Sequence, residues 1–188
     1  MVSATRSLTP ELVLEGAGRI VDREGLDALT MRHLADELGV AVTSIYWHVG
    51  NREELGDALV DRLIAEMGTL RATGATPRER IASLARALRR RLLDRPHVVA
   101  LAHERSRTAT VFRPVSDAMA TELADLGIAG PEAALALRAL ELHVVTSVLL
   151  VRTLDRFGST EPVDPTAAFE FTLTALLDAL ELRAGVCP

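Results

Sequence analysis

The chain has 188 residues, of which 48% are hydrophobic and only 3% are aromatic. This composition excludes an intrinsically disordered protein and predicts a core of Leu, Val and Ala, as in an all-α fold. The formal net charge of −5 excludes a generally basic chain that coats nucleic acid.

The first predicted helix runs from Pro10 to about Glu24. Thr9 is a good N-cap, Pro10 fits the first helical position, and Gly25 ends the apolar periodicity. The N-terminal sequence lacks the basic start and long apolar run of a signal peptide. Residues 1–70 hold six arginines against twelve acidic residues. Any binding of nucleic acid by this region must therefore depend on a small local surface.

Two short helices around a glycine turn are predicted between Thr30 and Leu55. Thr30 is a good N-cap, and Gly39 suits the left-handed position that ends a helix. The second helix is expected to start near Ala41 or Val42. Three residues at four-residue steps are expected to face inward, namely Ala41, Ile45 and Val49.

The second helix then turns hydroxyl, imidazole and aromatic groups outward. These groups suit phosphates, base edges and thymine methyl groups in a DNA major groove. We therefore interpret the segment as a DNA-reading helix-turn-helix. Its outward residues are Thr43, Ser44, Tyr46, Trp47 and His48.

The sequence YWHV at residues 46–49, followed by a polar pair and a basic residue, resembles the DNA-binding domain of the tetracycline-repressor (TetR) family. The resemblance covers about the first 70 residues. It implies a homodimeric, mostly helical one-component repressor that leaves double-stranded operator DNA when a small molecule binds the larger C-terminal domain. The residues that stand where the family contacts bases or phosphates are Arg32, Thr43, Ser44, Tyr46, Trp47, His48 and Arg52.

Three departures from the tetracycline repressors indicate a different operator. Val42 stands at the position of a base-reading glutamine, Thr43 at that of a proline, and Arg52 at that of a lysine. Two of the assigned residues also have simpler interpretations. Tyr46 could pack under the following helix and still offer its hydroxyl, and Arg32 could be an ordinary exposed helix residue.

The rest of the chain reads as helices, giving about nine in all and no strand. Capping boxes begin the helices at Asn51 and Thr76, and Asp164-Pro165 begins the last one. We expect a helix-turn-helix domain over residues 1–50 and an effector-binding and dimerisation domain, with the connecting helix, over 51–188. The predicted helices after the motif span about 51–70, 76–94, 96–104, 109–126, 131–157 and 165–183.

The penultimate helix is apolar nearly all round. It is long enough to cross a bilayer, but Arg138, Glu141, His143 and Arg152 argue for a packed helix and no membrane partner. One side should pack on its own domain and the other on a second subunit. We therefore expect a homodimer through residues about 131–183, built as a four-helix bundle.

An effector pocket is predicted in the C-terminal part of the chain. His143 lies mid-helix in apolar surroundings, so it either offers a polar group to the pocket or is a satisfied interior histidine. The histidines lack the spacing of a simple zinc site, although tertiary folding could still bring them together, and the sequence itself predicts no metal or cofactor. The candidate pocket residues are His97, His103, Phe112, His143, Thr146 and Ser147.

A run of arginines at residues 86–95 is basic enough to suggest anion binding, but a solvated helix face is the preferred interpretation. No catalytic motif is recognisable, so no enzyme is expected. The single cysteine, Cys187, allows no intrachain disulfide and fits a cytoplasmic protein. The predicted function is a ligand-responsive repressor. The alternative is a helical small-molecule-binding or catalytic protein with a non-functional helix-turn-helix.

Overall fold

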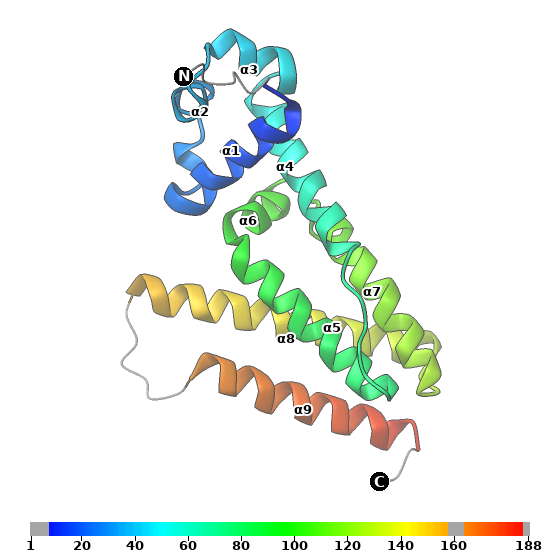
Figure 1. Cartoon of the computed structure of the whole chain (residues 1–188). Helices are drawn as coiled ribbons and strands as arrows, with labels where there is room; N and C mark the ends of the chain where they lie inside the picture. Colours follow the sequence, from blue (N-terminus) through cyan, green and yellow to red (C-terminus); the bar gives the residue numbers. More distant parts are fainter. Residues whose placement is uncertain (1–7, 158–163, 186–188) are drawn as a thin grey trace. The chain divides into compact units, whose positions relative to one another are not determined.

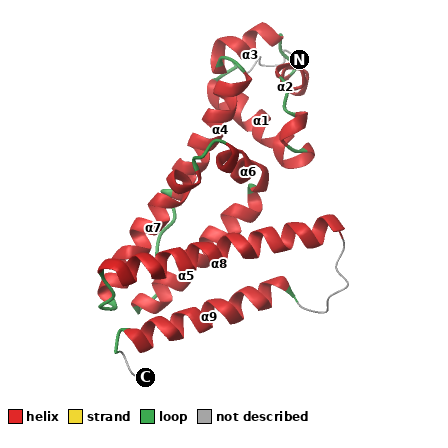
Figure 2. Ribbon diagram, turned by 180° about the vertical axis from the view of Figure 1, so that it is seen from behind, coloured by secondary structure: helices red, strands yellow, loops and turns green. Residues whose placement is uncertain are grey.

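The computed structural model describes residues 8–157 and 164–185, and over these ranges the chain is helical with no strand (Figures 1 and 2). The predicted all-α fold is confirmed. The helices are α1 (Pro10–Glu24), the 3₁₀ helix η1 (Leu26–Ala28), α2 (Met31–Leu38), α3 (Val42–Val49), α4 (Arg52–Met67), α5 (Pro77–Asp94), α6 (Pro96–Glu104), α7 (Thr108–Asp125), α8 (Gly130–Phe157) and α9 (Pro165–Arg183).

The chain divides into two compact units. The first contains residues 1–65 and 95–111, and the second contains residues 66–94 and 112–188. The segment around α6 therefore belongs to the same compact unit as α1 to α3, although α4 and α5 lie between them in the sequence. The functional boundary predicted after residue 50 stays a prediction, because compactness alone does not assign a function.

Local capping sets the helix ends of the first unit, as the sequence predicts. The Thr9 hydroxyl accepts from Leu12 N, and the Thr30 hydroxyl accepts from His33 N at 3.1 Å. Gly39 has φ 66° and ψ 36°, the left-handed conformation that costs glycine little. Asn51 and Glu54 form the expected reciprocal box ahead of α4.

The three-helix core of the first unit is built on large aliphatic residues. Ile20 of α1, Leu34 of α2 and Ile45 of α3 are fully buried. Gly16 lets α1 approach α2 closely, because a Cβ there would lie 2.9 Å from Leu38 Cδ2. Arg23 of α1 adds an ion pair to Glu37 of α2 at 3.1 Å.

Two local predictions about the helices between Val42 and Met67 were wrong. Ala41 is exposed, because it is the N-cap residue of α3 rather than part of its buried face. The connecting helix α4 ends at Met67, three residues earlier than predicted. The 3₁₀ turn η1 between α1 and α2 was not predicted at all.

In the second unit, α5 packs on α8 and α9, which lie side by side (Figures 1 and 2). Arg78 of α5 reaches both Asp178 and Glu181 of α9. Arg80 pairs with Glu122 of α7 at 2.6 Å. Two arginines near the start of α5 therefore fix this helix against two different neighbours.

Candidate nucleic-acid interface

Helix α3 has one buried residue and a strongly exposed opposite face. Ile45 is fully buried, whereas Trp47 is 89% exposed and Tyr46 is 50% exposed. Thr43, Tyr46 and Trp47 line a shallow hollow in the surface. Tyr46 therefore does not lie in the core, which was its alternative interpretation, although half of its surface is still covered.

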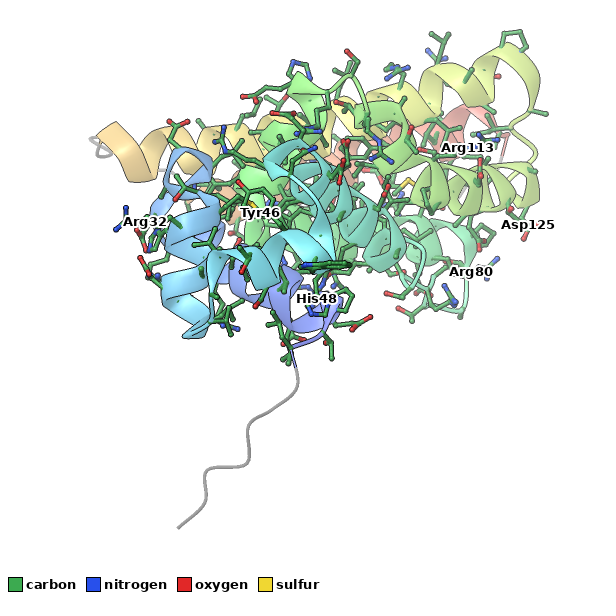
Figure 3. All side chains as sticks on the ribbon, turned by 90° about the horizontal axis from the view of Figure 1, so that it is seen from above. Arg32, Tyr46, His48, Arg80, Arg113 and Asp125 are labelled. Carbon is green, nitrogen blue, oxygen red and sulfur yellow. The ribbon has the colours of Figure 1, made fainter. Side chains whose placement is uncertain are left out.

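The remaining predicted contact residues lie on the same unit. Figure 3 labels two of them, Arg32 and His48. His48 and Arg32 are exposed, Ser44 is partly buried, and Arg32 makes no ion pair within the described residues. Glu11 of α1 lies close enough to His48 to interact with it. The pKa of Glu11 is lowered chiefly by a backbone hydrogen bond and by Thr9, with a smaller contribution from His48.

Arg52 has a structural role that its sequence position did not indicate. Its Nε donates to the carbonyl of Leu29 at 2.9 Å, and its Nη2 donates to that of Leu26 at 3.4 Å. The side chain thus connects the start of α4 to the η1 turn by two hydrogen bonds. Because a guanidinium has five N–H donors, contact with a phosphate remains compatible with these bonds.

Three arginines of the segment around α6 neutralise acids of α1 and α4. Arg95 pairs with Asp22, Arg107 with Asp61, and Arg105 with both Glu53 and Asp57. Residues 1–65 and 95–111 together contain nine arginines and twelve acids, a net charge of −3. The excess of acidic residues within the first 70 residues is therefore partly neutralised by arginines from a later segment of the chain.

The first turn of α3 is open to a ligand. No side chain caps the helix, because its N-cap residue is Ala41. The backbone N–H groups of a first turn have no partner within the helix, and the helix dipole makes this end favourable for an anion. A DNA phosphate could therefore bind here, next to the exposed Thr43.

The six predicted pocket residues are divided between the two units. His97 and His103 lie on α6 of the first unit, and the other four lie in the second. Phe112 and Ser147 are buried, but Thr146 is exposed. No group of three metal-binding side chains occurs in the ranges that the structure describes.

His143 is a satisfied, half-buried histidine. Its Nε2 lies 3.0 Å from the carbonyl oxygen of Phe169, and its ring stacks on the Phe169 ring at 4.7 Å. Burial lowers the pKa of His143, against a smaller opposing effect of the Phe169 carbonyl. The neutral ring therefore donates one hydrogen bond within the second unit, so its satisfied-interior interpretation is supported.

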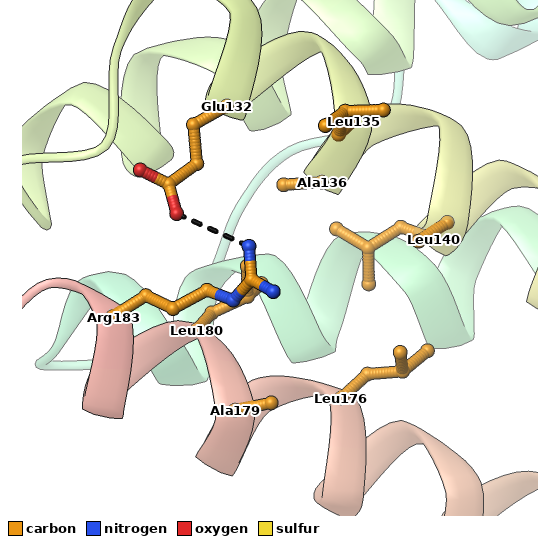
Figure 4. Close-up of a pocket in the computed structure, with 9 residues that line it drawn as sticks. Glu132, Leu135, Ala136, Leu140, Leu176, Ala179, Leu180 and Arg183 are labelled. Carbon is orange, nitrogen blue, oxygen red and sulfur yellow. Dashed lines mark hydrogen bonds and ion pairs between the residues drawn. The ribbon is translucent and has the colours of Figure 1, made fainter.

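Helices α8 and α9 leave large apolar side chains exposed. A groove of about 260 Å³ lies between them, with the Glu132–Arg183 ion pair at one end (Figure 4). In the described residues, Gly130–Val151 is long and apolar enough to span a membrane. Arg138 and Glu141 form an ion pair within this stretch. The exposed residues are Leu135, Leu142, Leu149, Leu150, Phe171 and Leu182.

Comparisons with known proteins agree with this geometry. A sequence model described as bacterial regulatory proteins, tetR family, matches residues 13–59. An HTH-type transcriptional regulator of Saccharopolyspora erythraea is 32% identical over 75% of this chain, which spans 60% of that regulator's length.

Solved structures also match nearly the whole chain. A variant of TetR from Acinetobacter baumannii AYE in complex with minocycline has a TM-score of 0.70 and 28% identity, covering 94% of this chain and 98% of its own. BioQ with its natural double-stranded DNA operator has a TM-score of 0.67 and 26% identity, covering 93% and 98%.

Proposed function

Because this chain belongs to the TetR family of bacterial regulatory proteins, we propose that it is a cytoplasmic, ligand-responsive transcriptional repressor. It binds a palindromic DNA operator as a homodimer and leaves it when a small molecule binds. Relatives of similar length are known with operator DNA and with a small molecule. The matched proteins are regulators, so we assign binding rather than catalysis to this chain.

The exposed face of α3 is the observation that carries this proposal. A tryptophan that is 89% exposed is unusual on a free surface, because its ring gains free energy when it is covered. Insertion of α3 into a major groove would cover this ring. It would also bring the Thr43 hydroxyl and the His48 imidazole to base edges or phosphates.

A homodimer follows from the small size of this surface. One eight-residue helix reads few base pairs, and a palindromic site lets two copies add their contacts. The exposed leucines of α8 and Phe171 of α9 offer an apolar face that a second copy would bury. Permanent dimers bury interfaces of about 2,000 Å² or more, which two long helices per subunit can supply.

Release of DNA requires that the effector distinguish two arrangements of the protein. Only Gly50 and Asn51 separate α3 from α4, so a movement of α4 would also move the DNA-reading helix. An effector with equal affinity for both arrangements would leave their relative populations, and so the DNA affinity, unchanged. Coupling energies of about 1–3 kcal/mol are usual, and they change DNA affinity by a factor of about 5–150.

The test uses DNA from the intergenic region beside the protein's own gene in a fluorescence-anisotropy titration. We expect Thr43→Ala and His48→Ala each to weaken specific binding by about 1–3 kcal/mol and to relax the preference at one base position. Thr121→Ala, an exposed threonine of α7, is the control and should bind like the wild type. Unchanged affinity in both α3 variants would contradict the assignment of α3 as the reading helix.

A further inference from the structure

Arg89 is a buried arginine whose charge no described carboxylate pairs with. It is only 9% exposed, although it lies in the arginine run for which the sequence predicts a solvated face. Its neighbours in that run behave differently, since Arg86 pairs with Glu170 and Arg91 with Glu66. Arg89 instead makes one hydrogen bond, from Nε to the Ser147 hydroxyl at 3.2 Å.

The groups around Arg89 do not neutralise it. Its Cζ lies 4.8 Å from the centre of the Phe169 ring, which offers a cation–π contact but no charge. The Ser147 hydroxyl donates to the Val144 carbonyl and is itself uncharged. Burying a charge without a partner is costly, so the guanidinium is stabilised only where its free edge meets water or an anion.

Glu170 is an acid that interacts electrostatically with both Arg89 and His143, but it already forms an ion pair with Arg86. Both carboxylate oxygens of Glu170 accept from Arg86, at distances of 2.7–3.1 Å. His143 adds no negative charge. Two arginines, one glutamate and a histidine that burial keeps neutral leave the cluster with one excess positive charge.

The free edge of the guanidinium is largely but not completely covered, since Arg89 is 9% exposed. Within the described ranges its two Nη atoms have no hydrogen-bond partner, and no completely buried side-chain nitrogen is left unsatisfied. These atoms therefore still reach solvent. Two parallel N–H groups of a guanidinium match the two oxygens of a carboxylate.

We propose that Arg89 is an anchor for a carboxylate group, so that the effector is an organic monocarboxylate bound at the free edge of this guanidinium. This inference rests on the proposed function, since it names the chemical class of the effector. A single negative charge balances the single excess positive charge of the cluster, whereas a phosphate dianion would exceed it. Ser147 and Phe169 hold the guanidinium in a fixed orientation for this contact.

The test compares acids with neutral analogues of the same shape on the full-length chain. Sodium benzoate and butyrate are titrated against benzamide and butyramide at constant ionic strength, by calorimetry or ligand-observed NMR. We expect each acid to bind at least about tenfold more tightly than its amide, because a charge-assisted bidentate contact is lost in the amide. Arg89→Gln should remove this preference.

Arg90→Gln is the matched control, since Arg90 is the exposed neighbour on the same helix, and it should keep the preference. Should Arg89→Gln fail to fold, Arg89→Lys keeps the charge but not the planar fork, and it should bind the acids more weakly than the wild type. Equal binding of acid and amide by the wild type would overturn the inference. So would an unchanged acid affinity in the folded Arg89 variant.

A parallel operator titration separates this inference from the proposed function. Operator binding without any preference for acids overturns only the carboxylate anchor. A preference for acids without operator binding overturns the repressor assignment and supports the anchor as a separate anion site.

Discussion

Arg105 Nη1 lies 2.5 Å from Asp57 Oδ1, and its Nη2 lies 2.8 Å from Glu53 Oε2. A single guanidinium at the end of α6 therefore holds two acids that are one turn apart on α4. Gly56 lies between these acids in the sequence, and a Cβ there would come within 2.6 Å of Arg105 Nη2. The absence of a side chain at residue 56 gives the arginine room to reach both carboxylates.

We expect Arg105→Gln to lower the free energy of unfolding by about 1 kcal/mol, the upper range for a partly exposed ion pair. The loss should shrink in high salt, because salt screens such pairs. Urea unfolding at low and high ionic strength measures both effects. Arg113→Gln is the control, since Arg113 and Asp117 are highly exposed and 3.9 Å apart. Equal losses in the two variants would contradict a special role for Arg105.

Arg52→Ala is expected to have two separable effects. Loss of the bonds to the Leu29 and Leu26 carbonyls should destabilise the protein by about 1 kcal/mol. If the side chain also contacts a phosphate, operator and non-operator DNA should both bind more weakly, and the slope of log affinity against log salt should decrease by about one. A variant that loses stability but keeps the salt slope would assign Arg52 a purely structural role.

The sequence predicts the features of the first unit that depend on neighbouring residues. The N-cap at Thr30, the turn at Gly39 and the box at Asn51 each require only a few consecutive residues, and all three occur. Their intact geometry also argues against a decayed helix-turn-helix. The bond from Arg52 to Leu29 joins residues 23 positions apart through a 3₁₀ turn that has no strong sequence signal.

Burial of charged residues was the least predictable property. Helical spacing places Arg89 within a basic run, but only the rotation of α5 against α8 and α9 decides that Arg89 points inward and Arg90 outward. The same rotation places His143 on Phe169 and leaves Thr146 exposed. Pocket residues from several helices cannot be selected from one sequence, because their side-chain directions depend on tertiary packing.

The double variant Leu142→Glu, Leu149→Glu should convert a dimer into a monomer. The two leucines are seven residues apart on α8 and are 58% and 59% exposed, so charges there should spare the fold of one chain but oppose burial in an interface. Light scattering should give about twice 20.3 kDa for the wild type and about 20.3 kDa for the variant. Trp47→Glu, an exposed apolar site on α3, should remain dimeric. A wild-type mass of one chain at micromolar concentration would contradict the predicted dimer.

His143 should make the stability of the protein depend on pH. Burial lowers its pKa below the ordinary value of 6.5, with a further lowering by Arg89 and opposing effects of the Phe169 carbonyl and Glu170. The unfolded chain therefore binds a proton at a higher pH than the folded chain does, so the free energy of unfolding falls as pH drops through 6.5 toward the folded value.

Urea unfolding at pH about 7.5 and about 5.5 measures this effect above the range in which carboxyl groups titrate. Glu37, Glu79 and Glu170 have lowered pKa values, so the stability they contribute is lost only at more acidic pH. We expect His143→Gln to lose less stability than the wild type between the two pH values. Thr146→Ala, which changes an exposed residue of the same helix that carries no titratable group, should lose as much as the wild type. An identical loss of stability in His143→Gln and the wild type would mean that the pKa of His143 is the same in the folded and the unfolded chain. The burial of its ring against Phe169 argues against that outcome.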